Sequence, residues 1–324
     1  MISFVSKAEL NQATKIVYKS MQPTMQHVWP GLAKELGCEL WVKHENHTPL
    51  GAFKIRGGLV YMEKRVMSGH TSGVVTASTG NHGQSVPYAA GRLGVKSVVV
   101  VPINNSIEKN AAMRSLGAEL IETGVDFDSA KNEAEKLAKD RNLHMVPSFH
   151  KDLVQGVSTY GLELFEAAGE LDAVYVPIGL GSGICGVMAV RDLLGLKTKV
   201  IGVVSEKANA YSRSFKKKQI VETSSVLTFA EGIAVRSPDL RALEAILVGV
   251  DHIVEVSDEL IADAIRLLFV NTHNVAEGAG AASLAGLMSE CSKMKNKRVG
   301  VILCGGNIDA QKFSLILNGK VPLV

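Results

Sequence analysis

The sequence predicts an α/β protein with two open, twisted, mostly parallel sheets that are flanked by helices. Short apolar runs rich in β-branched residues alternate with longer segments of helical periodicity. Continuous apolar strands separated by helices are typical of parallel sheets covered on both faces. The chain has 324 residues, 46% of them hydrophobic, so it can bury a large core and divide into a large and a small lobe. The expected strands are 73–77, 97–102, 118–123, 144–148, 173–178, 199–205, 252–257 and 298–306.

Composition excludes several classes of protein. The net charge is +3 and the densest basic run, 216–218, is short, so no nucleic-acid partner is expected. The four cysteines are widely spaced without a C-x-x-C motif, which indicates neither a zinc site nor a disulfide framework. No apolar run approaches the roughly 20 residues of a membrane span, and the first 20 residues do not resemble a secretory signal. We therefore expect a soluble, cytoplasmic protein with no membrane partner.

The stretch PIGLGSGICG, residues 177–186, follows an expected strand and opens a helix. Its glycines allow backbone N–H groups to approach an anion, and the start of the helix adds positive potential, so a phosphate is a suitable ligand. The same stretch matches G-x-G-x-x-G with Glu206 downstream, which also indicates a nicotinamide dinucleotide site. The dinucleotide fingerprint normally opens the first βαβ unit of a fold, whereas at least four expected strands precede residues 177–186. Their position therefore speaks against a dinucleotide site. A tight turn without a ligand remains a third interpretation.

Lys54 lies in GAFKIRGG, between Phe53 and Ile55. Most lysines are solvated, but apolar neighbours would desolvate this ammonium, lower its pKa and make the amine a nucleophile toward an aldehyde. A lysine that forms a Schiff base, together with a separate phosphate cradle, is what pyridoxal 5'-phosphate requires.

Three further stretches carry polar groups at strand ends or helix starts. STGNHG, residues 78–83, offers hydroxyls, an amide and free N–H groups that suit a carboxylate. Taken singly, Asn81 is explained as a turn residue and His82 as a buried imidazole. Cys304 in CGGNID is explained as a small apolar residue, and Glu277 in VAEGAGAAS as a first-turn carboxylate of a helix.

Taken together, these stretches resemble the threonine and serine dehydratase family of pyridoxal-phosphate enzymes, which includes serine racemase and has the tryptophan-synthase-β fold (fold type II). The resemblance covers about residues 43–309. It is carried by KHENHTPLGAFKIRGG, ASTGNHGQS, PIGLGSGICG, EGIAVR, VAEGAGAA and LCGGNID. It implies a large cofactor-binding domain formed by residues 1–50 and 149–324, and a small domain, 51–148, that closes over the substrate. It also implies a homodimer or homotetramer.

The resemblance implies a role for each matching position. Lys54 would form the Schiff base and then remove the substrate α-proton, Phe53 would pack near the cofactor ring, and Asn81 would bind its 3-hydroxyl. Cys304 would face the pyridine nitrogen, with Gly232 and Glu277 near the ring. The substrate carboxylate would be held by Ser78, Thr79, Gly80 and His82. The phosphate would be held by Gly179, Leu180, Gly181, Ser182 and Gly183.

These roles imply α,β-elimination of water from a small 3-hydroxy amino acid such as L-threonine or L-serine, which gives a 2-oxo acid and ammonia. A thiol at position 304 cannot protonate the ring nitrogen as an aspartate would, and this favours elimination over reprotonation. 3-Hydroxyaspartate dehydration, racemisation and β-replacement on the same scaffold remain alternatives, as does a dehydrogenase more remotely. A non-catalytic amino-acid-binding homologue is a further alternative.

The chain departs from the family pattern at several positions. Ala52 replaces a serine, and Leu180 and Ser182 replace glycines of the phosphate loop. Relatives that bind a divalent cation carry a glutamate and an aspartate where this chain has Val204 and Ala210, so no metal is expected, although Glu206 remains a displaced candidate. Thr79 stands where racemases use serine, which makes racemisation secondary. No regulatory domain follows residue 309, so feedback inhibition is not expected.

The sequence does not select the substrate. Lys131 and His150 are conceivable contacts for a second substrate carboxylate, but both are better explained as solvated surface residues.

Overall fold

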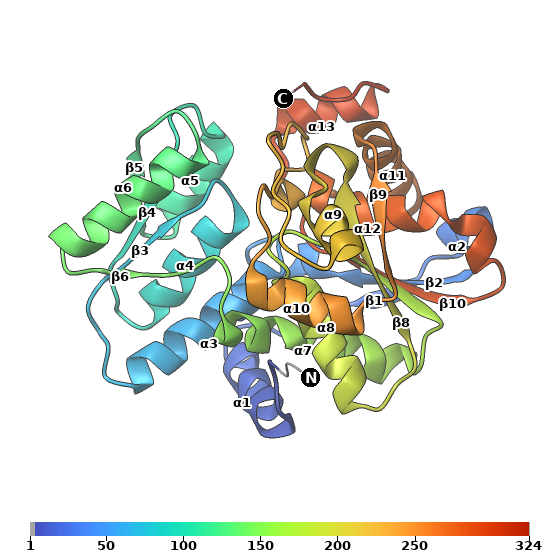
Figure 1. Ribbon diagram of the computed structural model, residues 1–324, viewed down its shortest axis with the longest axis horizontal. Coiled ribbons are helices and arrows are strands. Elements are labelled where there is room, and N and C mark those ends of the chain that lie inside the picture. Colours follow the sequence, from blue (N-terminus) through green and yellow to red (C-terminus); the bar gives the residue numbers. More distant parts are fainter. Residues whose placement is uncertain (1–3, 324) are drawn as a thin grey trace.

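The computed structural model describes residues 4–323 and places two sheets in separate lobes (Figure 1). The larger sheet has the strand order β1-β2-β10-β7-β8-β9 and is parallel except for the antiparallel β1–β2 pair. The smaller, fully parallel sheet has the order β5-β4-β3-β6. The predicted α/β class with two mostly parallel sheets is therefore confirmed.

The large sheet consists of β1 (Gln26–Val28), β2 (Glu39–His44), β7 (Ala173–Pro177), β8 (Lys199–Ser205), β9 (His252–Val256) and β10 (Arg298–Leu303). The small sheet consists of β3 (Val74–Ala77), β4 (Ser97–Val101), β5 (Glu119–Glu122) and β6 (His144–Met145). All eight expected strands are present. The sequence analysis missed β1 and β2. The strand β1 has only three residues, and β2 buries the polar side chains of Lys43 and His44, so neither shows an apolar run.

The helices that accompany the small sheet are α4 (Asn81–Arg92), α5 (Ile107–Ser115) and α6 (Phe127–Asp140). The remaining helices are α1 (Lys7–Tyr18), α2 (Pro30–Leu36), α3 (Lys54–Met67), α7 (Lys151–Ala168), α8 (Ser182–Leu193), α9 (Ala210–Lys217), α10 (Leu240–Gly249), α11 (Asp258–Thr272), α12 (Gly278–Ser289) and α13 (Ala310–Leu317). Single 3₁₀ turns are η1 (Glu45–His47), η2 (Glu206–Ala208), η3 (Glu231–Ile233) and η4 (Cys291–Met294). No helix within residues 4–323 is long and apolar enough to cross a membrane.

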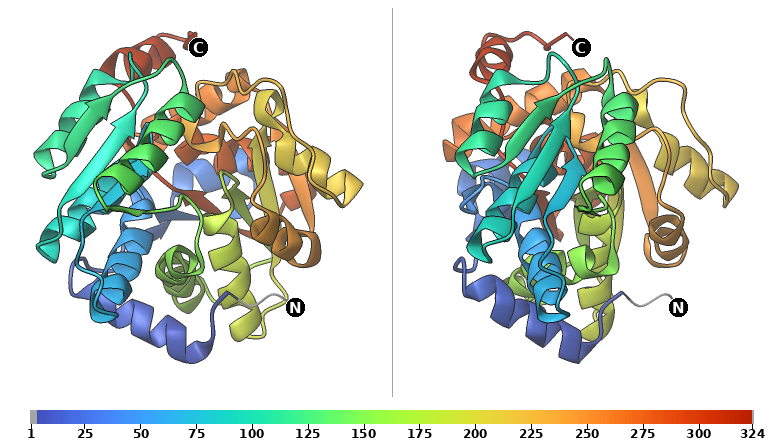
Figure 2. Two further views of the ribbon diagram at one scale, coloured as in Figure 1. Left: turned by 60° about the vertical axis from the view of Figure 1, so that its left-hand side comes forward. Right: turned by 90° about the vertical axis from the view of Figure 1, so that its left-hand side faces the viewer.

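The largest core surrounds the six-stranded sheet, and smaller apolar clusters cover the four-stranded one. Strands β7 and β10 are buried almost throughout, as their continuous apolar sequences predict. Helix α3 runs from the border between the lobes and packs on both α4 and α7 (Figure 2). This helix therefore joins the two lobes, and its first residue is Lys54.

Helix α4 contains a proline, which has no backbone N–H to donate. The structure places Pro87 inside α4, which begins at Asn81, so this residue lies in the second turn and interrupts the backbone hydrogen-bond ladder.

Candidate active site

Four chain segments meet where the two lobes adjoin: the start of α3, the β3–α4 loop, the β7–α8 loop and the segment after β10. The backbone N–H of Phe53 donates to the carbonyl of Cys304 at 3.0 Å, and the N–H of Gly306 donates to the carbonyl of Gly51 at 2.8 Å. The Lys54 ammonium donates to Ser182 Oγ at 3.3 Å. These contacts bring loops at the carboxyl ends of parallel strands together, which is where ligands bind in open α/β sheets.

The Lys54 amine lies in a desolvated position beside residues 178–183. These residues form the β7–α8 loop and the start of α8, and we call them the phosphate-type loop. Its Nζ is 4.9 Å from the centroid of the Phe53 ring. Burial lowers the pKa of this amine to about 8, against the opposing effect of the Glu277 carboxyl. About a tenth of the Lys54 amine is therefore unprotonated at pH 7, far more than for an ordinary lysine, and this fraction can act as a nucleophile.

The loop between β7 and α8 has the shape of an anion cradle. Gly181 has a φ of +100° and immediately precedes α8, whose N-terminus carries positive potential. A Cβ on Gly181 would lie 2.7 Å from the Cβ of Ala242, and one on Gly179 would overlap the carbonyl oxygen of Gly232. The Leu180 carbonyl accepts a hydrogen bond from Tyr211 at 2.9 Å. The loop thus tolerates Leu180 in place of a family glycine while keeping glycine at its crowded positions.

The β3–α4 loop presents the first turn of α4 to the same space. Ser78 Oγ accepts from the N–H groups of Gly83 at 2.9 Å and Gly80 at 3.3 Å. Thr79 and Gly80 are partly exposed, and no atom of the described residues lies within 4 Å of a Cβ built on Gly80. This turn has room for a ligand, and a helix N-terminus favours an anionic one.

His82 is buried, and its Nε2 finds no hydrogen-bond partner within the described part of the chain. Burial, together with the nearby Lys54 charge, lowers the pKa of this imidazole to about 3. His82 is therefore neutral at physiological pH, and it offers one unpaired ring nitrogen.

A chain of amide and carboxyl groups connects this loop to the segment after β10. Asn307 donates to Asn81 Oδ1 at 2.8 Å, and Asn81 Nδ2 donates to Glu277 Oε1 at 2.7 Å. These bonds fix the orientation of the Asn81 amide and leave its second N–H available. In CGGNID the family resemblance gave a role only to Cys304, and in STGNHG it gave one to Asn81. The position of Asn307 just after a strand end, where ligands bind in open α/β sheets, is a signal that was available for this second amide.

Cys304 is buried at the end of β10, and burial raises the pKa of its thiol well above the usual range. The group at this position is therefore a neutral thiol. Gly232 lies on η3, and its carbonyl oxygen approaches Gly179. A Cβ built on Gly232 would lie 2.7 Å from the Cβ of Ala279.

Glu277 precedes α12 and is also buried. Burial raises the pKa of its carboxyl from 4.5 to about 7, although Lys109 and the Asn81 hydrogen bond both favour the charged form. The folded chain therefore binds more protons than the unfolded chain between these two values, so stability falls as pH rises through this window.

We expect Glu277→Gln to remove this pH dependence. The cofactor-free wild type should lose about 3 kcal/mol of unfolding free energy, relative to the variant, between pH 4 and pH 8. Urea unfolding of both proteins across this range measures the difference. Parallel profiles would contradict the raised pKa of Glu277.

Lys109 on α5 was not predicted from the sequence. Its ammonium pairs with Glu231 of η3 at 2.5 Å, and Lys312 of α13 pairs with the other oxygen of Glu231 at 2.6 Å. Because α5 accompanies the small sheet, this ion-pair group connects the two lobes.

Other candidates lie elsewhere. Lys131 is exposed on α6 beside Glu135 at 3.9 Å, and His150 caps α7 and pairs with Asp152 at 3.3 Å. Glu206 is exposed on η2. Within residues 4–323, no group of three or more histidine, cysteine, aspartate or glutamate side chains is arranged to hold a metal ion.

Covalent binding of a phosphorylated aldehyde requires an uncharged amine next to an anion cradle, and Lys54 and the β7–α8 loop provide both. This arrangement is the one that an enzyme carrying an aldehyde cofactor on a lysine requires. A family model described as pyridoxal-phosphate dependent enzyme matches residues 19–305. The chain belongs to this family, and pyridoxal phosphate is its cofactor.

Individual relatives agree with this assignment. The chain is 36% identical over 286 residues to an L-threonine ammonia-lyase of Geobacter sulfurreducens, which covers 88% of this chain and 71% of that protein. It is 32% identical to a serine racemase of Schizosaccharomyces pombe, with 88% of each chain covered. The processed form of threonine deaminase isoform 2 from Solanum lycopersicum superposes with a TM-score of 0.90 and 29% identity, covering 97% of this chain and 94% of that one.

Proposed function

We propose that the protein is an ammonia-lyase that eliminates water from a small 3-hydroxy amino acid such as L-threonine or L-serine and releases a 2-oxo acid and ammonia. The observation that carries this proposal is the position of the Lys54 amine, 3.3 Å from Ser182 Oγ in the phosphate-type loop. The names of the similar threonine ammonia-lyases and deaminase support it. When bound, the cofactor supplies an electron sink for negative charge at the substrate α-carbon.

Lys54 has two tasks in this proposal. Its amine would hold the cofactor aldehyde and, when free, would take the α-proton of the substrate. A pKa near 8 suits both tasks, because a base is most effective when its pKa lies near the working pH. Phe53 packs beside the amine and excludes water from it.

The first turn of α4 holds the substrate carboxylate. Thr79 is partly exposed beside this turn, and Ser78 still has its O–H to donate after its oxygen has accepted two backbone bonds. The second N–H of Asn81 is directed by Glu277 and Asn307 and binds the cofactor 3-hydroxyl. The neutral His82 adds a ring nitrogen to the carboxylate site.

The residues around the ring direct the reaction toward elimination. A neutral Cys304 thiol would hold the pyridine nitrogen of the cofactor without giving it a full proton, and the cofactor would then supply a weak electron sink. Such a sink would favour loss of the β-hydroxyl over reprotonation. Gly232 and Glu277 complete this part of the site.

We also propose the two-domain division at residues 50 and 148, assembly as a homodimer or homotetramer and a cytoplasmic location. The division is supported by the small sheet, whose strands all lie within residues 74–145. Assembly rests on the resemblance to the dehydratase family, and the cytoplasmic location rests on the four widely spaced cysteines, which indicate no disulfide framework.

A panel of amino acids tests the proposed reaction. We expect L-threonine or L-serine to give equimolar 2-oxo acid and ammonia, measured by mass spectrometry and an ammonia assay. Stereoisomers of 3-hydroxyaspartate belong in the panel, because that substrate is an alternative. Recovery of the opposite enantiomer without ammonia would overturn the lyase proposal in favour of a racemase. The partly exposed Thr79 hydroxyl is the group that such a reaction would use.

A further inference from the structure

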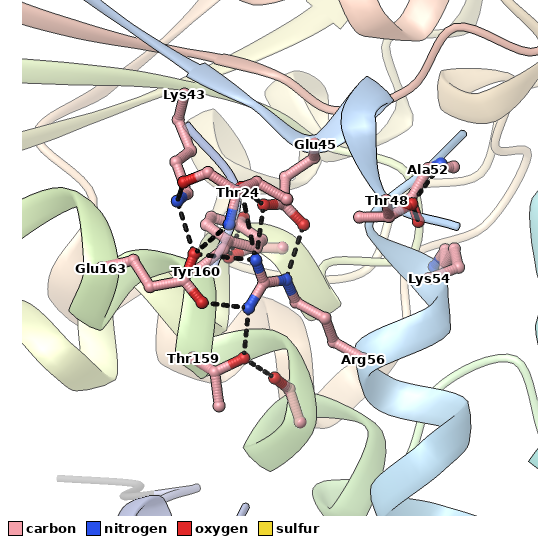
Figure 3. Close-up of polar contacts among 12 residues, drawn as sticks. Thr24, Lys43, Glu45, Thr48, Ala52, Lys54, Arg56, Thr159, Tyr160 and Glu163 are labelled. Carbon is pink, nitrogen blue, oxygen red and sulfur yellow. Dashed lines mark hydrogen bonds and ion pairs between the residues drawn. The ribbon is translucent and has the colours of Figure 1, made fainter. Parts of the chain in front are cut away.

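A group of four buried charged side chains lies behind Lys54 and has no assigned role. It contains two cations and two carboxylates, so its formal charges cancel. Its members come from β2, the following 3₁₀ turn, α3 and α7, and none has a side chain more than 4% exposed (Figure 3). We call it the charge quartet, and its members are Lys43, Glu45, Arg56 and Glu163.

Arg56 is the centre of the charge quartet and lies two residues after Lys54 on α3. Its Nε and Nη2 donate to the two oxygens of Glu45 at 2.7 and 2.9 Å. Its Nη1 and Nη2 donate to the two oxygens of Glu163 at 2.5 and 2.8 Å, and Nη1 also donates to Thr159 at 2.8 Å. Figure 3 shows the Arg56 side chain reaching toward both glutamates on the side away from Lys54. A lysine cannot reproduce these planar, paired contacts.

Glu163 is held from several other directions. It accepts from Lys43 Nζ at 2.5 Å, from the Tyr18 hydroxyl at 2.9 Å and from the backbone N–H of Thr24 at 3.1 Å. Charged hydrogen bonds of this kind are short and directional. The end of Arg56 that is remote from Lys54 is therefore fixed to α7 and to the segment before β1.

The same stretch of α7 also reaches the phosphate-type loop. Tyr160, next to Thr159, donates its hydroxyl to the carbonyl of Gly183 at 3.0 Å. Its ring meets the Phe53 ring edge-on, with centroids 6.0 Å apart. Helix α7 thus makes two contacts. It binds Arg56 of α3, the helix that begins at Lys54, and its own Tyr160 binds Gly183 at the start of α8.

We propose that Arg56 and Tyr160 are positioning residues that set the spacing between the Lys54 amine and the phosphate-binding loop, with α7 as the rigid element between them. This inference rests on the proposed role of Lys54 as the attachment point. Neither residue contacts the reacting atoms. A cofactor bound at both ends, to an amine and to a phosphate loop, is sensitive to a small change in this spacing.

Tyr160→Phe tests the proposal with the smallest change, and Tyr175→Phe is its matched control. Tyr175 is equally buried and donates to Glu290 at 3.0 Å, away from the amine. We expect Tyr160→Phe to release pyridoxal phosphate about tenfold faster than the control and to shift the pH titration of the visible cofactor band. Identical release rates and titrations in the two variants, at equal thermal stability, would overturn the proposal.

Arg56→Lys and Glu163→Gln test the charge quartet. We expect Arg56→Lys to speed cofactor release about a hundredfold and to lower kcat more than it raises KM. Glu290→Gln is the control for Glu163→Gln, because both carboxylates accept a tyrosine hydroxyl.

The outcomes separate this inference from the proposed function. Wild-type protein without a visible cofactor band would refute the proposed function. Normal wild-type behaviour with unaltered variants would refute only the positioning role.

Discussion

Lys54→Ala is expected to remove the visible absorption band of the cofactor and to lower turnover of threonine or serine by at least about 10³-fold. The variant loses both the covalent attachment and the base that takes the α-proton. The amine is the desolvated group nearest the phosphate-type loop, since its Nζ lies 3.3 Å from Ser182 Oγ. Absorption spectra after addition of pyridoxal phosphate, followed by single-turnover measurements of oxo-acid release, give the two results.

Lys64→Ala is the matched control, because Lys64 lies on the same helix, α3, and pairs with Asp152 at 2.7 Å rather than facing the site. We expect the control to keep the band and to keep turnover within a few-fold of wild type. A Lys54→Ala protein that retained the visible band after dialysis would show that another amine carries the cofactor.

The sequence predicted strands where the side chains are continuously apolar, and it failed where burial is achieved by ion pairing. Strand β10 reads as a buried strand because its apolar residues need no partners. Strand β2 buries Lys43 only because Glu163, 120 residues later in the chain, neutralises it. No local pattern shows a partner at that distance, so a buried lysine reads as a surface residue.

The same distinction applies to the site. Lys54 was identifiable because Phe53 and Ile55 are its neighbours in sequence, and desolvation by neighbours is a local property. Arg56 and Tyr160 were missed because their roles depend on contacts with distant segments, namely Glu45, Glu163 and the carbonyl of Gly183. The role of Asn81 came from the family resemblance, and the contact of Asn307 with Asn81 joins residues 226 positions apart in the chain, which no local pattern shows.

The match to a dinucleotide fingerprint shows how one local geometry serves two cofactors. The loop after β7 provides a left-handed glycine and a helix N-terminus, and these are what any phosphate requires. The feature that distinguishes the cofactors is the second anchor. A dinucleotide site needs an acidic residue for the ribose, whereas Glu206 is exposed on η2 and the amine of Lys54 approaches the loop instead.

Gly156→Ala is expected to destabilise the cofactor-free protein by at least about 3 kcal/mol, because it would separate α7 from α3 where their backbones touch. A Cβ on Gly156 would overlap the carbonyl oxygen of Arg56 and would lie 2.6 Å from its carbonyl carbon and 2.8 Å from the Cα of Gly57. Backbone atoms cannot rotate away as a side chain can, so the helices themselves must move. Urea unfolding of wild type and variant measures the loss.

Gly91→Ala provides the opposite expectation on another helix. Gly91 is exposed on α4, and the nearest atom to its Cβ would be the carbonyl oxygen of Leu116 at 3.9 Å, so alanine should stabilise the protein by about 0.5–1 kcal/mol. If both variants were as stable as wild type, α7 and α3 would not be in rigid contact. Helix α7 would then not hold Lys54 at a fixed distance from the phosphate-type loop, because the two helices touch at Gly156 of α7 and Arg56 of α3.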